Sequence, residues 1–428
     1  MRRLNAADPA FDADFAAFLA RPRGAPEAVD ATVAEVIEKV RTEGIAAVLE
    51  FTRLFDGVDI SEADLRVSAE EIEAGTANCP AAVRDALAFA ARRIRAYHER
   101  QRPTDGEFVD EDGVTLGWRW TPLDSVGIYV PGGRAAYPST VLMNAVPADV
   151  AGVSRIAMAS PPGRLAPAVL AAAREAGVTE IWRIGGAQAV AALAYGAGPI
   201  APVDKIVGPG NAYVAAAKRQ VFGKVGIDSL AGPSEIVVVA DASVDPAWIA
   251  ADLLSQAEHD PDAQSILITD DEDFAAAVEL EIERQLQSLP TCDVAAASWR
   301  DHGAIILAPL IRAPALVDAI APEHVEFALA EPEALAARVR HAGAIFLGTH
   351  SPEAVGDYIA GPNHVLPTSG TARFSSGLAT SDFMKRTSVT RLDAAAFARI
   401  AGPAETLAEA EGLPAHARSL AMRRKDSA

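Results

Sequence analysis

The chain has 428 residues, half of them apolar, and a formal net charge of −20. This length exceeds one ordinary hydrophobic core and predicts two or more domains. The acidic balance argues against nucleic acid as a partner, because phosphate binding needs clustered lysine and arginine. The sequence has no apolar run of the ~18 residues that span a membrane, and its N-terminus lacks the continuous apolar stretch of a secretory signal.

Cysteine usage points to a reducing compartment. Cys79 and Cys292 are too few for a disulfide framework and lack the spacing of a metal site. We expect two reduced, structural thiols in a cytoplasmic protein. Any metal site must then be built from histidine, carboxylate and amide ligands.

The first quarter of the chain is helical in pattern. Apolar residues recur at helical spacing over residues 11–20, 31–55 and 81–101. A polar hinge then leads to residues 114–123, a predicted strand that carries two of the five tryptophans. These segments precede the part of the chain in which strands dominate.

From Val126 onward, short apolar strands alternate with glycine or proline turns and alanine-rich helices. The first set of strands is predicted at residues 126–130, 155–160, 180–184 and 205–207, and the second set at 235–241, 265–270, 303–309 and 343–348. Continuous apolar strands between helices predict parallel sheets that are covered on both faces. Two α/β units of similar size are therefore expected. After Ser376 the rhythm stops and a mixed tail follows.

Three glycine turns follow strands of the first set, at residues 127–133, 184–189 and 207–214. Each could present backbone N–H groups to a ligand at the carboxyl edge of a sheet. The sequence has neither G-x-G-x-x-G nor a P-loop, and glycines also serve simply to permit tight turns. The turns therefore favour a shared ligand groove, and from the residues alone a dinucleotide is only weakly indicated.

A glutamine and a histidine stand three residues apart at the end of a predicted helix. An Asp-Pro pair at 245–246 is typical of a helix start, and another at 260–261 stops the helix. Residues three apart face the same way, so Gln256 and His259 can bind one ion without backbone strain. On its own, such a pair is more often part of a solvated helix face.

Later positions carry groups that could complete a metal site. Glu323 and His324 place a carboxyl beside an imidazole, and Asp357, His364 and His416 add oxygen and nitrogen donors of the kind that Zn²⁺ accepts. Taken singly, each histidine is more often a core or surface residue than a ligand, and Glu323 and His324 could be a solvated helix start. Their functional interpretation is an adjacent acid–base pair.

Many long runs of the chain occur in the order of a known family. The chain resembles histidinol dehydrogenase over nearly its whole length. The matching runs are residues 126–133, 184–196, 203–219, 225–228, 231–235, 252–260, 321–324, 343–348, 356–358, 361–368 and 410–419. The resemblance implies a zinc enzyme that oxidises L-histidinol twice, through the aldehyde, to L-histidine. Two NAD⁺ are used in this last step of histidine biosynthesis.

The family also implies a fold and a domain organisation. The expected class is α/β, with two incomplete Rossmann-like parallel-sheet domains and smaller N- and C-terminal helical extensions. Residues 1–23 would form an N-terminal arm. Residues 24–125 with 236–375 would form the first Rossmann-like domain, which carries the metal and catalytic residues. Residues 126–235 would form the second, with the NAD-side turns, and residues 376–428 a tail.

The family's functional residues carry over position by position. The metal ligands fall on Gln256, His259, Asp357 and His416, and the catalytic pair falls on Glu323 and His324. The NAD contacts fall on Tyr129, Gln188 and Asn211. The substrate contacts fall on Ser234, Gln256, His259, His324, Asp357, Glu411 and His416. The resemblance also implies a homodimer in which the tail, with Glu411 and His416, completes the partner's site.

Two alternatives remain at this stage. Relatives of the family oxidise other small alcohols twice, including sulfonated diols, although Glu411 favours a cationic substrate over an anionic one. A zinc hydrolase with Glu323 as the base for a metal-bound water is a third hypothesis. It would leave the three glycine turns without a purpose.

Overall fold

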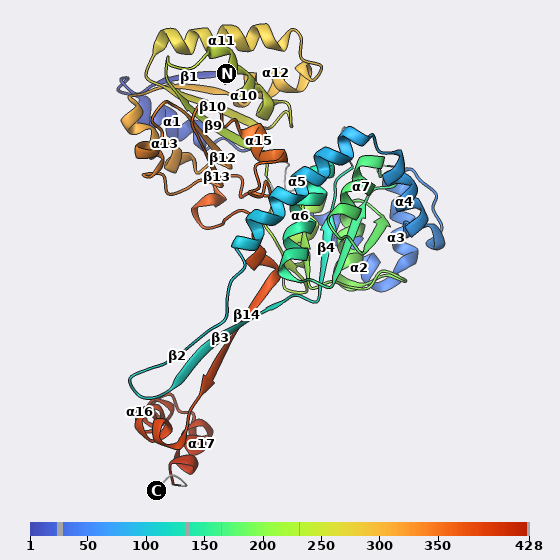
Figure 1. Ribbon diagram of the computed structural model, residues 1–428, viewed down its shortest axis with the longest axis vertical. Coiled ribbons are helices and arrows are strands. Elements are labelled where there is room, and N and C mark those ends of the chain that lie inside the picture. Colours follow the sequence, from blue (N-terminus) through green and yellow to red (C-terminus); the bar gives the residue numbers. More distant parts are fainter. Residues whose placement is uncertain (24–28, 133–136, 164, 231, 426–428) are drawn as a thin grey trace.

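The computed structural model describes residues 1–23, 29–132, 137–163, 165–230 and 232–425. It contains two parallel sheets, each covered by helices, and an antiparallel ribbon that leads away from them to a pair of C-terminal helices (Figure 1). Gly133 and Ala231, which belong to two of the matching runs, lie outside the described residues.

One sheet has six parallel strands in the order β1-β11-β10-β9-β12-β13. Counted from β9, five of them follow the order 3-2-1-4-5 that begins a Rossmann fold, and β1 adds an edge strand beside β11. All residues of β9, β10 and β12 are buried, as the apolar runs of β9 and β10 predict. β12, which contains His324 and Glu326, was not predicted as a strand. The strands are β1 (Arg2–Asn5), β9 (Glu235–Ala240), β10 (Gln264–Thr269), β11 (Ala304–Leu307), β12 (His324–Ala328) and β13 (Ala344–Leu347).

Helices cover both faces of this six-stranded sheet. On one face α1 (Phe11–Leu19), α13 (Ala313–Ile320) and α14 (Glu333–Ala336) pack against it. On the other face lie α10 (Pro246–Ala257), α11 (Glu272–Leu286) and α12 (Cys292–His302). The expected N-terminal arm is thus an edge strand and a helix of this sheet.

The other sheet has five parallel strands in the order β6-β5-β4-β7-β8. Counted from β4, the strand order is again 3-2-1-4-5. Both sheets are therefore Rossmann-like, and the expected fold class is confirmed. Its strands are β4 (Ser125–Tyr129), β5 (Arg155–Ser160), β6 (Glu180–Arg183), β7 (Lys205–Val207) and β8 (Gly226–Ile227). Its crossover helices are α6 (Pro138–Ala151), α7 (Pro167–Glu175), α8 (Gly186–Tyr195) and α9 (Ala212–Val221).

The helices of the first hundred residues pack on the five-stranded sheet. α4 (Ala69–Asn78) and α5 (Ala81–Arg100) lie with α6 and α7 on one face, and α2 (Val29–Glu43) and α3 (Ile45–Phe51) lie with α8 and α9 on the other. The sequence interpretation had grouped them with residues 236–375. The structure differs because both faces of a parallel sheet need apolar cover, and these helices stand directly before β4 in a chain whose connections are short.

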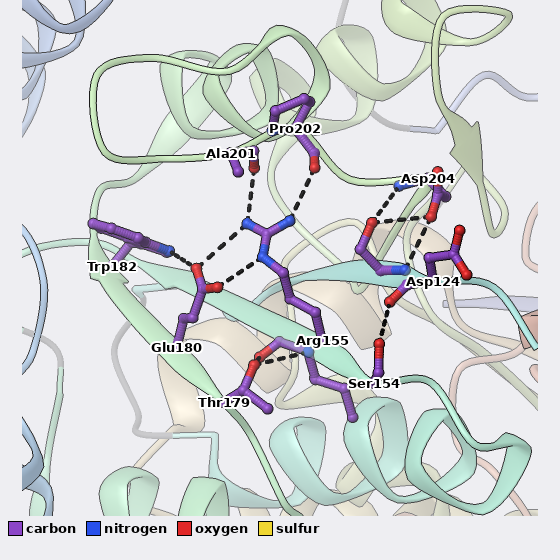
Figure 2. A network of polar contacts seen from close by, with 11 residues as sticks. Asp124, Ser154, Arg155, Thr179, Glu180, Trp182, Ala201, Pro202 and Asp204 are labelled. Carbon is purple, nitrogen blue, oxygen red and sulfur yellow. Dashed lines mark hydrogen bonds and ion pairs between the residues drawn. The ribbon is translucent and has the colours of Figure 1, made fainter.

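The amino edge of the five-stranded sheet is closed by a polar network around Arg155 (Figure 2). Its Nε lies 2.7 Å from Oε1 of Glu180, and its two Nη atoms donate to the carbonyl oxygens of Ala201 and Pro202. Trp182 Nε1 donates to the same glutamate at 3.1 Å. Because these bonds tie the starts of β5 and β6 to the loop before β7, this edge is structural.

The ribbon is formed by β2 (Gly106–Val109), β3 (Thr115–Pro122) and β14 (Met384–Arg391), with β3 in the middle. At its far end α16 (Ala394–Ala410) and α17 (Pro414–Lys425) pack on each other. Figure 1 shows this pair well away from both sheets.

Short elements complete the chain. They are a π-helix at Thr52–Asp56, α15 (Glu353–Tyr358) and 3₁₀ turns at Glu62–Asp64, Leu310–Arg312, Thr371–Arg373 and Thr380–Phe383. Among the described residues, no helix is both long and apolar enough to cross a membrane.

Candidate active site

The predicted catalytic pair lies at the start of β12, beside the start of β9. The backbone N–H of Glu235 donates to Oε2 of Glu323 at 3.0 Å, and Nδ1 of His324 lies 3.1 Å from the carbonyl oxygen of Glu235. One residue of β9 therefore holds both side chains. Just before the pair, Ala321 ends α13 at φ 53°. Such a conformation costs a residue with a side chain about 1–3 kcal/mol and marks strained backbone beside the pair.

Burial sets the protonation of this pair. It raises the pKa of Glu323 well above its usual value, and it lowers the pKa of His324 to about 4. The imidazole is therefore neutral near pH 7. Since its Nδ1–H donates to the Glu235 carbonyl, Nε2 carries a free lone pair and can accept a proton.

Three of the four predicted metal ligands lie together. Gln256 lies near the end of α10, on the buried side of the helix, and its Nε2 lies 3.1 Å from Nδ1 of His259. Nε2 of His259 lies 3.8 Å from Oδ2 of Asp357, which α15 supplies. Oε1 of Gln256 is buried and has no hydrogen-bond partner within the described part of the chain. An orphaned amide oxygen beside an imidazole and a carboxylate fits the nitrogen and oxygen donor set of a zinc ion.

Glu353 is a buried acid that the sequence interpretation missed. Its Oε1 lies 3.7 Å from Nε2 of His324, and His324, Glu353 and Asp357 present possible ligand atoms within 4.8 Å of one another. Burial raises the pKa of Glu353 to about 9, so its carboxyl favours the protonated form near pH 7. The spacing could have revealed it, because residues 353 and 357 are four apart and share a helix face.

His364 also joins the cluster. Its Nδ1 lies 3.0 Å from the carbonyl oxygen of Asp357, and burial lowers the pKa of the imidazole. The segment between these two residues is anchored to helices of the five-stranded sheet. Arg93 of α5 donates to the carbonyl oxygens of Ile359 and Ala360, and Asn363 donates to that of Met143 at 2.5 Å. The Asp357 side of the site is thereby tied to the other sheet.

Two predicted NAD contacts lie at the carboxyl edge of the five-stranded sheet. Tyr129 ends β4, and its hydroxyl oxygen accepts a hydrogen bond from the N–H of Gly186 at 3.0 Å. Burial raises the pKa of this phenol to about 12, so it stays protonated. Gln188 lies in the second glycine turn, at residues 184–189, and is buried. Its Oε1 has no hydrogen-bond partner among the residues that the structure describes.

The third glycine turn shares this edge. A Cβ at Gly208 would lie 2.2 Å from the carbonyl oxygen of Tyr129, and the glycine has φ +110°, so the close approach of β4 and the turn requires a glycine. Asn211, the third predicted NAD contact, caps α9 by accepting from the N–H groups of Tyr213 and Val214 at 3.1 Å. Its carbonyl oxygen is thus already engaged.

The remaining predicted residues divide between the site and the tail. Ser234 is half-buried and directly precedes β9, next to the residue that holds the catalytic pair. Glu411 and His416 are exposed at the two ends of the α16–α17 turn, and the ribbon carries them far from the six-stranded sheet of the same chain (Figure 1). Within one chain, these two residues do not meet the other site residues.

Two Rossmann-ordered sheets with a neutral histidine beside a buried carboxyl define an α/β protein with a buried acid–base pair. Sequence comparison narrows the class. The sequence model of the histidinol dehydrogenase family matches residues 19–424. The chain belongs to the histidinol dehydrogenase family.

Individual relatives agree with this assignment over the whole chain. The histidinol dehydrogenase of Caulobacter vibrioides is 70% identical over 423 residues, which cover 99% of each protein. That of Rhodospirillum rubrum is 61% identical over 98% of each protein. The crystal structure of histidinol dehydrogenase from Elizabethkingia anophelis superposes with a TM-score of 0.95 at 35% identity, covering 100% of this chain and 98% of that one.

Proposed function

We propose that this chain oxidises L-histidinol in two steps, through the aldehyde, to L-histidine in the cytoplasm, as the last step of histidine biosynthesis. The observation that carries the proposal is the buried Glu323–His324 pair, held by Glu235 beside the Gln256–His259–Asp357 cluster. NAD, bound at the turns that contain Tyr129, Gln188 and Asn211, would supply the hydride acceptor for both steps.

The first oxidation needs a base for the proton of the substrate hydroxyl. His324 fits this role, since its imidazole is neutral and its Nε2 is free to accept. The Glu235 carbonyl accepts from Nδ1–H, so it fixes the orientation of the ring and stabilises the imidazolium that forms.

The second oxidation needs the aldehyde to be hydrated first, because only the gem-diol has a hydride to give. Glu323 fits the role of activating the water. Burial raises its pKa, so its carboxylate, once formed, is a strong base. His324 lies beside it, with Nδ1 3.8 Å from Oε2 of Glu323, and can take the hydroxyl proton again.

Gln256, His259 and Asp357 would hold the zinc ion, with His416 as the fourth ligand. When bound, the ion would hold the amine and imidazole nitrogens of the substrate and so act as a template. Ser234 and Glu411 would add substrate contacts, and the carboxylate of Glu411 suits a cationic substrate.

His416 and Glu411 can complete a site only if that site belongs to a second copy of the chain. Both are exposed at the end of a ribbon that leads away from the sheets (Figure 1). We therefore propose a homodimer in which each tail completes the partner's site.

The activity is tested by the amount of NADH formed per L-histidinol consumed, with and without a chelator. We expect a ratio near two, and its loss after chelation. Turnover of a sulfonated diol with no NADH from L-histidinol would overturn the substrate assignment. Hydrolysis without NAD would overturn the reaction class.

The shared site is tested by mixing two inactive chains. Heterodimers of His324→Ala and His416→Ala chains contain one site with neither substitution, so part of the activity should return. Verified heterodimers that stay inactive would contradict the shared site.

A further inference from the structure

The five-stranded sheet lacks an acidic residue at the place where Rossmann folds usually carry one. In such folds a carboxylate close to the end of the second strand accepts a hydrogen bond from the ribose 2′-hydroxyl of NAD. The second strand of this sheet is β5, which ends at Ser160 and continues into Pro161. The recognition of the ribose must therefore come from another segment.

Asp56 brings a carboxylate to this edge from the N-terminal helices. It is the last residue of the π-helix Thr52–Asp56, a rare form that is frequent at functional sites. Phe51 and Phe55 stack within this turn, with ring centroids 5.4 Å apart, and Gly57 ends it in the left-handed region. Asp56 thus stands at the end of a turn with a defined backbone conformation.

Contacts place the carboxylate next to the carboxyl ends of β5 and β6. A Cβ at Gly185 would lie 3.2 Å from Oδ1 of Asp56 and 2.7 Å from Cγ of Pro161, so the glycine is lodged between the two. Oδ2 of Asp56 lies 3.4 Å from Nε2 of Gln188. Asp56 therefore stands beside the residue that follows the second strand and beside a predicted NAD contact.

The groups around Asp56 have unused hydrogen-bonding capacity. Oε1 of Gln188 and Oγ of Ser160 are both buried and lack a hydrogen-bond partner in the part of the chain that the structure describes. Burial raises the pKa of Asp56 itself, which shows that the carboxyl is partly removed from water. A half-buried carboxyl at an edge with orphaned polar atoms fits a polar ligand better than a fully solvated surface.

We propose that Asp56 accepts hydrogen bonds from the adenosine ribose hydroxyls of NAD and excludes the 2′-phosphate of NADP. This inference rests on the proposed NAD-dependent function. A 2′-phosphate would meet the carboxylate at close range and be repelled. The nearby Arg183 is already engaged, because its guanidinium donates to the carbonyl oxygens of Asp64 and Arg66 and to Glu71. It offers no compensating charge for a phosphate.

Binding without turnover tests this role. The ligands are ADP-ribose and its 2′-phosphate, titrated calorimetrically into the full-length enzyme and its Asp56→Asn variant. The wild-type chain should prefer ADP-ribose by at least about tenfold. The variant should bind ADP-ribose about tenfold more weakly and lose most of the preference, since a hydrogen bond to a charged group is worth about 1.5–3 kcal/mol.

The matched control is Asp59→Asn, which removes the same charge from an exposed position three residues away and should change neither affinity. Asparagine at 56 can still accept from Gln188, so a merely structural role of Asp56 predicts an unchanged preference. Thermal unfolding checks that each variant is folded, and Asp56→Ser serves if Asp56→Asn is not. The kcat/KM ratio for NAD and NADP should shift in the same direction.

The outcomes separate the inference from the proposed function. A wild-type chain that binds ADP-ribose, with a preference unchanged in both Asp56 variants, overturns the role of Asp56 alone. A wild-type chain that binds neither ligand and forms no NADH overturns the proposed cofactor and the inference together.

Discussion

The two sheets share one strand order and use opposite edges. In the six-stranded sheet, His324 is the first residue of β12 and Ser234 directly precedes β9, so the predicted catalytic pair and this predicted substrate contact lie at the amino edge. In the five-stranded sheet, the Arg155 network closes the amino edge (Figure 2), and the glycine turns lie at the carboxyl edge. The same topology therefore carries the proposed reaction site at the amino edge of one sheet and the proposed cofactor site at the carboxyl edge of the other.

Both sheets have buried titratable groups packed around them. Around the six-stranded sheet, burial raises the pKa of Glu326 to about 9 and that of Asp252 to about 6. On α5, which packs on the five-stranded sheet, burial lowers the pKa of His98 to about 4. A raised acid pKa costs stability as the pH rises, whereas a lowered histidine pKa costs stability as the pH falls. Glu326 and Asp252 therefore respond to pH in the opposite direction to His98.

Removing the base should have the largest effect. His324→Gln keeps a polar side chain of similar reach but cannot take a proton, so kcat should fall by about 10²–10⁴-fold. The KM for NAD should change little, because the cofactor turns belong to the other sheet. Steady-state kinetics measures both constants, and the control is His350→Gln at an exposed position outside the cluster. A kcat that stays near wild type would show that the amino edge of the six-stranded sheet is not the reaction site.

Much of the fold could be predicted from the sequence, for a physical reason. Buried parallel strands need continuous apolar residues, so β9 and β10 are visible as runs. β12 was not predicted, because His324 and Glu326 interrupt its apolar residues. The sheet against which α2–α5 pack was not predictable from their periodicity, because an apolar helix face fits either sheet. The π-helix at Thr52–Asp56 leaves no periodic signal and was also missed.

The candidate site was partly predictable. Gln256 and His259 show their shared face through spacing, and the cluster with Asp357 appears as the resemblance implied. Glu353 was missed although it stands four residues before Asp357, because its role depends on burial against His324, which the spacing alone does not show. His416 and Glu411 cannot be joined to the site from one chain, since their place there depends on a second copy.

The pH response of the five-stranded half should be intermediate in size. The His98 side chain is fully buried, and its pKa is about 4 in the folded protein against 6.5 as the usual value. Between these values the unfolded chain binds more protons, so stabilisation that is complete above pH 6.5 is lost as the pH falls to about 4. The shift corresponds to about 3 kcal/mol.

His98→Gln should flatten this loss. Calorimetric melting temperatures of the wild type and the variant, measured from pH 7 to pH 4.5, give the comparison. The wild type should lose more of its melting temperature over this interval than the variant does. Equal losses would show that the buried imidazole is not what makes this half sensitive to acid.

A substitution at the carboxyl edge of the five-stranded sheet, where we propose that NAD binds, should have the smallest effect. It should change KM and not kcat. Gln188→Met keeps most of the buried volume but removes both polar atoms next to the Gly185–Gly186 turn. The KM for NAD should rise about tenfold, the equivalent of one hydrogen bond at ~1.4 kcal/mol, while kcat changes by less than about threefold. This is the reverse of the pattern expected for His324→Gln. If Gln188→Met instead lowered kcat and left KM unchanged, the division of chemistry and cofactor binding between the two sheets would fail, because the carboxyl edge would then act in the transition state.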